Sequence, residues 1–292
     1  MIYEYALDPG VLRDWQVFKY LADGFGFSRA RLIARYPKDW PHLAYEVIRK
    51  LDDNAKKRFV TWLADRATPA MTRPRVGAQP YTLPTWYENA IAEHRRKSFH
   101  AIIADQPSSD NPPILQFSDV DGATALWAVG TQVFIARNVA EIVKYAAPVV
   151  ADAQTIKFID PYFKGDPDQV RILIGCLSSC VAEGKTSVLA IELHVDGRQV
   201  QPQTENHVLT QLGRKWLSGL PQIKLVRWTP DYLHNRFILT DRGGIAFGDS
   251  LRQHRSRPDQ MTLLEDGTRA HWWNYHDDSL HPSEVLKPGE PA

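Results

Sequence analysis

The sequence predicts an α/β domain, with a mixed sheet flanked by helices, preceded by a small all-α domain. From about residue 138 onward, apolar strand-like segments alternate with amphipathic helical segments, the pattern of an α/β unit. Residues 1–70 instead show helical periodicity that glycine and proline interrupt. Four prolines between residues 68 and 85 mark a break. We therefore expect a helical bundle domain over 1–70, a Pro-rich linker over 71–85 and the α/β domain over 86–292.

The first 70 residues predict four short helices, over 9–22, 28–36, 41–51 and 53–63. Pro9 and Pro41 occupy first-turn positions, where proline is favoured. Several cations lie close together in and just after the second of these segments: Arg29, Arg31, Arg35 and Lys38. They are interpreted either as a solvated helix face or as a surface that contacts phosphates or an acidic partner.

The rest of the chain predicts strands over 99–104, 114–117, 125–129, 132–135, 155–159, 187–193 and 223–228. It predicts helices over 86–97, 138–150, 168–181 and 205–217. Several of these strands are continuous apolar runs, as expected when helices cover both faces of a sheet.

The composition excludes some classes of protein. The chain has 292 residues, is 43% hydrophobic and carries a formal net charge of +1, so any nucleic-acid site must be a local patch. Cys176 and Cys180 lie four apart in an apolar helical pattern, typical of core packing in a reducing compartment. The N-terminus lacks a secretory pattern, and no run of about eighteen apolar residues occurs. We expect a cytoplasmic protein without membrane association.

The stretch from Tyr232 to Leu251 contains the candidate catalytic residues. His234 and Arg236 are two residues apart, so on a β-strand they would share a face and place a base or nucleophile beside a fixed cation. Residues 241–244, Asp-Arg-Gly-Gly, predict a hairpin turn, and 245–247 the return strand. This turn would bring Ser250 back towards His234.

This spacing resembles the His-x-Lys-x4-Asp motif of the phospholipase D superfamily. The matching positions are His234, Arg236, Asp241 and Gly248. The match has three departures: Arg236 replaces lysine, Asp249 stands where the strict pattern has serine, and Leu251 replaces asparagine. The ending Gly-x-Ser-Leu is similar to that of compact bacterial members. A strand ending in Asp-Pro-Tyr-Phe, here 160–163, often precedes the motif in such domains, and the resemblance covers about residues 86–292.

The resemblance implies phosphodiester cleavage without a metal or other cofactor. His234 would be the nucleophile that forms a phosphohistidine, Arg236 would bind the equatorial oxygens, and Ser250 would donate a hydrogen bond to the phosphate. Asp241 falls on the opposite strand face and is interpreted as an orienting or structural group rather than a direct acid. The leaving oxygen needs a second proton donor, which two-motif members supply with a second histidine. This chain has one motif, so either two copies pair as a homodimer or the site is inactive; His194 is a weak candidate within the chain.

The motif lies in the most basic stretch of the chain. Its arginines are predicted to bind substrate: Arg242, Arg252, Arg255 and Arg257. Such a stretch suggests DNA or RNA rather than lipid, although a flexible arginine-rich loop is an equal interpretation. The first hypothesis is a metal-independent phosphodiesterase that acts as a nuclease. The alternative is a catalytically inactive subunit that binds nucleic acid or a protein partner in a larger complex. Residues 1–70 could dock that partner, as in multi-gene bacterial defence or DNA-processing systems.

Overall fold

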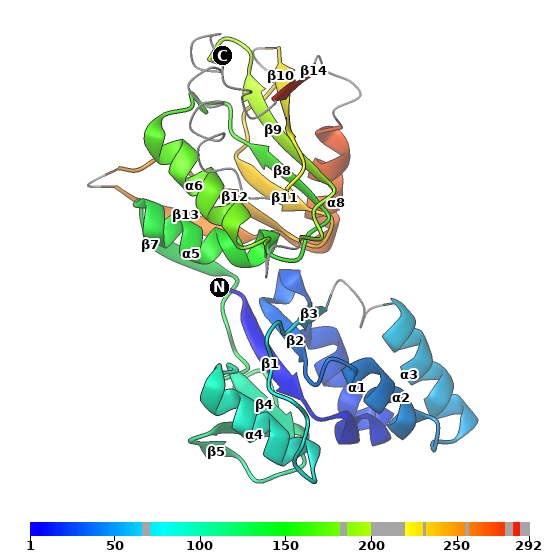
Figure 1. Cartoon of the computed structure of the whole chain (residues 1–292). Helices are drawn as coiled ribbons and strands as arrows, with labels where there is room; N and C mark the ends of the chain where they lie inside the picture. The colour runs from blue at the N-terminus through cyan, green and yellow to red at the C-terminus, as the bar shows by residue number, and fades with distance from the viewer. Residues whose placement is uncertain are drawn as a thin grey trace. The chain divides into compact units, whose positions relative to one another are not determined.

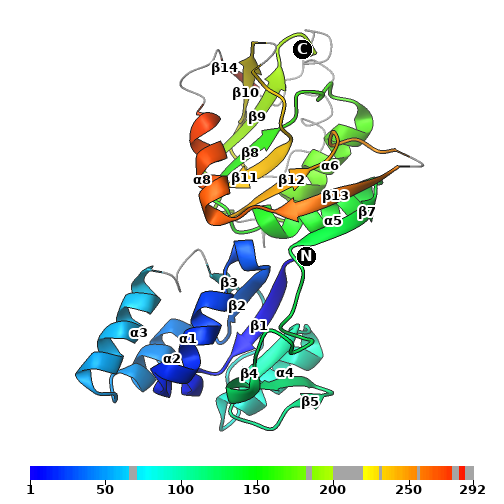
Figure 2. The same cartoon turned by 180° about the vertical axis from the view of Figure 1, so that it is seen from behind.

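The structure is a computed structural model. It describes residues 1–65, 71–181, 186–199, 220–229, 232–254, 257–277 and 283–286. The chain divides into two compact units, Met1–Thr131 and Gln132–Ala292 (Figures 1 and 2). Within the described ranges, none of the helices is both long and apolar enough to cross a membrane.

The first unit contains a six-stranded sheet with the order β3-β2-β1-β4-β6-β5, in which only the β5–β6 pair is antiparallel. Its strands are β1 (Tyr3–Leu7), β2 (Arg31–Arg35), β3 (Thr72–Pro74), β4 (Ala101–Ala104), β5 (Ser109–Asp110) and β6 (Pro113–Gln116). Its α-helices are α1 (Trp15–Gly24), α2 (Trp40–Ile48), α3 (Asp53–Asp65) and α4 (Trp86–Arg96). Three 3-10 helices join them: η1 (Pro9–Arg13), η2 (Phe27–Arg29) and η3 (Phe117–Asp119).

Helices cover both faces of this sheet. Tyr5 and Leu7 of β1 lie in one buried cluster with side chains of α1, α2 and α3. Ala6, between them, lies in a second cluster with Trp86 and Ala90 of α4. Because successive strand side chains point to opposite faces, α1, α2 and α3 cover one face and α4 covers the other.

The all-α domain predicted for residues 1–70 is wrong, because β1 and β2 lie within it. The helix predicted over 28–36 is largely the strand β2, while the helices predicted over 41–51 and 53–63 correspond to α2 and α3. A short strand buried on both faces is a continuous apolar run, which periodicity does not separate from a buried helix. The stretch 71–85 contains β3 and lies inside the first unit, which extends to Thr131.

The second unit contains an eight-stranded mixed sheet with the order β14-β10-β9-β8-β11-β12-β13-β7. Its strands are β7 (Gln132–Ala136), β8 (Thr155–Ile159), β9 (Ala190–Asp196), β10 (Ile223–Trp228), β11 (Phe237–Thr240), β12 (Gly244–Phe247), β13 (Pro258–Leu263) and β14 (Ser283–Leu286). The pairs β8–β9 and β9–β10 are parallel, and the other pairs are antiparallel. Its described helices are α5 (Val139–Val150), α6 (Pro167–Ser178) and α8 (Asp266–Tyr275).

Helices also flank this second sheet. Helices α5 and α6 pack together on one face, and α8 packs on the other (Figures 1 and 2). Phe237 and Leu239 of β11 lie in a buried cluster with Trp272 and Trp273 of α8. The predicted α/β class, with a mixed sheet flanked by helices, is confirmed. The strands predicted over 155–159 and 223–228 have the predicted bounds, and the helix predicted over 205–217 lies outside the described residues.

Candidate functional site

The strand register brings several chain segments to one edge of the second sheet. β8 ends at Ile159, which pairs with Phe237 at the start of β11. Because β11, β12, β13 and β7 are successively antiparallel, β12 and β7 end, and β13 begins, at this same edge. The residues that directly follow or precede these strand ends are Asp160, Arg236, Gly248 and Arg137.

A buried carboxylate organises this edge. Asp160 is fully buried, and its Oδ2 accepts hydrogen bonds from Ser250 Oγ (2.7 Å) and Leu251 N (2.9 Å). Its Oδ1 accepts one from Tyr162 N (2.9 Å). Burial raises the pKa of Asp160, while these hydrogen bonds and the charge of Arg236 act in the opposite direction. Asp160 thereby holds the end of β8 against the segment that follows β12.

This arrangement gives Ser250 a role other than the predicted one. Its Oγ donates to Asp160 and also lies 3.3 Å from Gln169 Nε2, which donates to it. A hydroxyl has one proton to donate, and that proton is directed to Asp160. Ser250 is therefore anchored at the edge of the site, and a hydrogen bond from it to a phosphate would require its proton to change partner.

Gly248 and Arg137 shape the segment after β12. A Cβ at Gly248 would lie 2.6 Å from Asp259 Oδ1, and Gly248 N donates to that same oxygen (3.1 Å), so only glycine fits without movement. The buried guanidinium of Arg137 donates to Asp249 Oδ2 (2.5 Å) and to the carbonyls of Ser250 (3.1 Å) and Arg252 (3.2 Å). Burial alone would raise the pKa of Asp249, but the hydrogen bond from Ser250 N and the neighbouring arginines lower it.

Arg236 lies at this edge, and its guanidinium contacts an aromatic ring but leaves one buried N–H without a hydrogen-bond partner among the described residues. The guanidinium carbon is 4.8 Å from the ring centroid of Tyr162, a cation–π contact. Arg236 Nε is buried and has no hydrogen-bond partner within the described residues. An unpaired N–H that is shielded from water is costly, so an anion that accepted its hydrogen bond would be favoured.

A pocket of about 380 Å³ opens at this edge. Its lining side chains are Arg137, Tyr162, Lys164, Arg236, Asp249, Ser250, Arg252 and His254. Four of them are permanent cations and one is a carboxylate, which is already paired with Arg137. The pocket is therefore an electropositive site whose size and donors suit a phosphate group.

His234 is placed differently from the prediction. It is exposed, it lies in the segment before β11, and it is not among the side chains that line this pocket. The expected strand does not include His234 or Arg236, because β11 begins at Phe237. The pairing with β8 ends there, where Asp160 and Pro161 follow, and proline has no N–H for a further ladder bond.

Asp241 and Arg242 lie at the opposite end of β11 from Arg236. Asp241 Oδ1 accepts hydrogen bonds from Gln154 N (2.9 Å) and Thr155 N (3.1 Å), which ties the hairpin turn to the start of β8. Arg242 is buried, and its Nη1 lies 3.5 Å from a carboxylate oxygen of Asp152. Asp241 thus has a structural position, and the prediction that Arg242 binds substrate at the motif is wrong.

Of the other residues considered for the site, one lines the pocket, two described ones do not, and one lies outside the described residues. Arg252 lines the pocket, whereas Arg257 is exposed before β13 and does not. Arg255 lies outside the described residues. His194 is fully buried, with its Nε2 2.8 Å from Glu192 Oε2 and its Nδ1 accepting from Trp228 Nε1 (2.9 Å), so it is a core residue.

The predicted site residues did not include five residues that line the pocket: Arg137, Tyr162, Lys164, Asp249 and His254. Tyr162 belongs to the Asp-Pro-Tyr-Phe segment that follows β8, which was a usable signal. Arg137 is 112 residues from Asp249 in the sequence, and only the β13–β7 pairing places it here. Lys164 carried no signal that separated it from a surface lysine.

Comparison with known proteins gives distant structural likenesses. No protein-family model matches the chain, and no curated protein matches it. Nuc from Salmonella typhimurium, a phospholipase D family member, is similar with a TM-score of 0.37 and 9% identity over 52% of this chain and 97% of Nuc. TrmBL2, an archaeal chromatin protein, is similar with a TM-score of 0.31 and 10% identity over 50% of each chain. Neither likeness defines the fold or the function, so the inference below rests on the residues of the site.

Proposed function

We propose that this protein is a metal-independent phosphodiesterase of the phospholipase D type, acting as a nuclease on DNA or RNA. The observation that carries the proposal is the pocket in which Arg236, with its unpaired Nε, lies beside Lys164 and Arg252. The motif supports the reaction class, because His234 precedes Arg236 by two residues and the segment with Ser250 lies beside it.

In this proposal the guanidinium of Arg236 binds the phosphate oxygens, and Tyr162 holds the guanidinium in place through its ring. His234 attacks phosphorus, so that a phosphorus–nitrogen bond forms as the bond to the leaving oxygen breaks. Water then cleaves the phosphohistidine and restores His234. The exposed position of His234 requires that its imidazole turn into the pocket when substrate binds.

The leaving oxygen needs a proton, and in this proposal His254 gives it. His254 lines the same pocket as Arg236. Its backbone N–H donates to the backbone carbonyl of Arg137 (2.8 Å), which fixes the main chain of His254 there. A histidine in the pocket would remove the need for a second copy of the motif. A homodimer that pairs two motifs is the other arrangement, and the oligomeric state distinguishes them.

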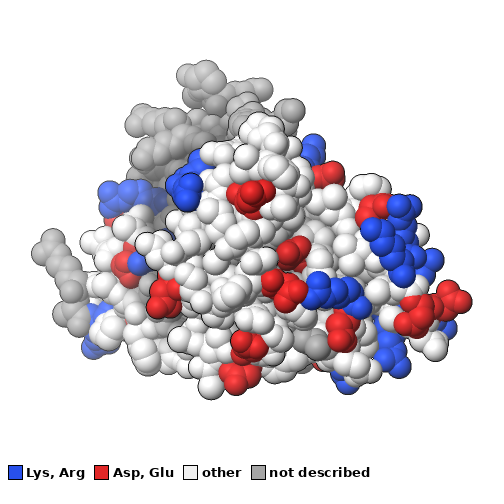
Figure 3. All heavy atoms as spheres, turned by 90° about the horizontal axis from the view of Figure 1, so that it is seen from below, with Lys and Arg blue, Asp and Glu red and all other residues white. Residues whose placement is uncertain are grey.

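The substrate class follows from local charge. On the face shown in Figure 3, basic and acidic side chains are interspersed, in keeping with a net charge of +1. The cations of the pocket therefore act at close range on a phosphate backbone, as in nucleic-acid binding. Such an activity would suit a bacterial defence or DNA-processing system.

Two observations favour a second candidate function, a subunit that binds nucleic acid without cleaving it. His234 does not line the pocket, and the proton of Ser250 is donated to Asp160. With these two features the cationic groups can still bind a phosphate, but the proposed nucleophile and the Ser250 hydroxyl are not directed at it. This subunit would act within a larger complex, with a protein partner at the first unit.

The two functions are separated by incubating the purified chain with end-labelled DNA and RNA in EDTA. Cleavage that His234→Ala abolishes supports the phosphodiesterase. Binding without turnover, with an affinity that falls steeply as salt rises, supports the binding subunit. Equal cleavage by the His234→Ala protein discards the proposed mechanism. Light scattering on the same samples shows whether the active form is a monomer or a dimer.

A further inference from the structure

The first unit carries a pocket of its own, at the ends of two parallel strands. It has a volume of about 640 Å³. Its lining includes Arg35 at the end of β2, Lys38 and Asp39 just beyond it, and residues 74–81, which begin at the last residue of β3. β2 and β3 are parallel, so their carboxyl ends meet at the same sheet edge. In sheets of this kind, ligands bind outside the carboxyl ends of the strands.

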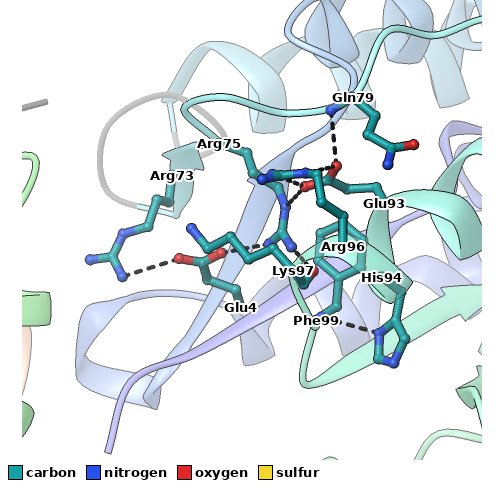
Figure 4. A network of polar contacts seen from close by, with 9 residues as sticks. All are labelled: Glu4, Arg73, Arg75, Gln79, Glu93, His94, Arg96, Lys97 and Phe99. Carbon is teal, nitrogen blue, oxygen red and sulfur yellow. Dashed lines mark hydrogen bonds and ion pairs between the residues drawn. The ribbon is translucent and has the colours of Figure 1, made fainter. Parts of the chain in front are cut away.

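One wall of this pocket is held rigidly by buried ion pairs (Figure 4). The fully buried guanidinium of Arg75 donates from Nε to Glu93 Oε1 (2.7 Å) and from Nη1 to Glu4 Oε2 (2.9 Å). Gln79 N donates to Glu93 Oε2 (2.9 Å). Burial opposes the ionised form of Glu93, but hydrogen bonds from Arg96, Gln79 N and Arg75 outweigh it and lower its pKa to about 2. The segment predicted to be a linker is thus a fixed wall whose charges are internally paired.

The lining from the end of β2 carries two cations, Arg35 and Lys38, for which the described residues provide no side-chain partner. Neither Arg35 nor Lys38 has a side-chain hydrogen bond or ion pair within the described part of the chain, and Arg35 Nε is buried without a partner. Asp39 stands beside them at the start of α2, where its side chain makes no capping hydrogen bond. Tyr81 faces the same space and is 41% exposed, which leaves much of its ring available for contact.

We propose that this pocket binds a nucleoside monophosphate. Arg35 and Lys38 bind the phosphate, the base stacks on Tyr81, and the carboxylate of Asp39 accepts hydrogen bonds from the ribose hydroxyls. A bare phosphate fits less well, because the Asp39 carboxylate on the same rim repels an anion that brings no hydroxyl donors. The volume is within the range of small-molecule sites. This site is separate from the pocket at Arg236, and it does not rest on the phosphodiesterase proposal.

The test is isothermal titration calorimetry of the full chain with the four common nucleoside monophosphates, their nucleosides and inorganic phosphate. We expect at least one monophosphate to bind, and its nucleoside and inorganic phosphate to bind at least about tenfold more weakly. Lys38→Met should weaken the monophosphate at least about tenfold. Tyr81→Ala should weaken the monophosphate but leave inorganic phosphate unchanged.

Two matched controls guard this test. Lys50→Met changes an exposed lysine of the same unit outside the pocket and should leave binding unchanged. Every titration is repeated in the Arg236→Ala chain, which removes phosphate binding at the proposed nuclease pocket, and the binding assigned to the pocket of the first unit should persist there. The absence of binding by all four monophosphates, or equal binding by Lys38→Met, overturns the proposal. Inorganic phosphate that binds as well as the nucleotide reduces the pocket to a simple anion site and overturns the assignment.

Discussion

Replacing Arg137 with methionine should destabilise the chain through the segment that shapes the pocket at Arg236. The buried guanidinium donates to the carbonyls of Ser250 and Arg252 and to the carboxylate of Asp249. A hydrogen bond to a charged group contributes about 1.5–3 kcal/mol. The Asp249 side chain is 49% exposed, so its ion pair adds under about 1 kcal/mol after solvent screening. We expect Arg137→Met to lower the free energy of unfolding by about 2–4 kcal/mol, because methionine fills the space but pairs with neither carbonyl.

Urea unfolding followed by circular dichroism measures this loss, and its pH dependence provides a further check. The pKa of Asp249 is lowered in the native chain, so its contribution is present above the unfolded pKa of about 3.9 and is lost as the pH falls below it. Without Arg137 that pKa moves back towards its usual value, so the deficit of the variant should shrink in acid. Arg252→Met is the matched control, because its side chain is exposed and should cost under about 0.5 kcal/mol. A loss under about 0.5 kcal/mol for Arg137→Met at pH 7 would refute the role given to this guanidinium.

Three further changes test other parts of the site. Gly248→Ala should destabilise by about 1–3 kcal/mol in the same unfolding assay, since its Cβ would lie 2.6 Å from Asp259 Oδ1; an unchanged midpoint contradicts this. Burial raises the pKa of Asp160, so the native chain binds that proton more tightly and the stability falls as the pH rises from about 4 through the raised pKa. Asp160→Asn should therefore flatten this slope, and an unaltered slope would count against the assignment. Arg252→Ala should lower the slope of log K against log salt by about 0.7–0.9 for nucleic acid, whereas Arg257→Ala, an exposed arginine outside the pocket, should not; equal effects mean that the basic stretch acts diffusely.

His254 gives the sharpest kinetic distinction. If it protonates the leaving oxygen, His254→Asn should lower the cleavage rate at least about 100-fold while the affinity for uncleaved oligonucleotide changes little. Full activity in this variant would refute the role of His254. If the enzyme is also a dimer, the proton donor would be the histidine of the motif in the second copy.

The extent to which sequence predicted the fold depended on the length and flanks of each element. Helix α4 has a capping box in which Thr85 Oγ1 accepts from Glu88 N and the Glu88 side chain accepts from Thr85 N, and the predicted helix over 86–97 matches it to within one residue. Strands β8 and β10 stand between clear helical or loop segments, and their bounds were also correct. β1 and β2 are five residues long and were not predicted, because their apolar character arises from burial between helices. The strand predicted over 125–129 is a turn, in which Trp127 N donates to the carbonyl of Thr124.

The site could be predicted only where the sequence keeps its members close together. Arg236 and Ser250 belong to one hairpin and its continuation, and both reach the pocket. Arg137 and Tyr162 come from other strands, and the register that collects them depends on long-range pairing. Arg242 failed as a prediction because proximity in the sequence placed it near the motif, while the hairpin carries it to the far end of β11.

The central claim is that Arg236 and its neighbours form a phosphate site, and a crystal structure of the chain soaked with tungstate tests it most directly. Tungstate is a tetrahedral oxyanion, and its anomalous signal identifies its position. The account predicts a tungstate ion within hydrogen-bond distance of Arg236, with Lys164 or Arg252 as a further ligand. Tungstate bound elsewhere while this pocket remains empty would contradict the account.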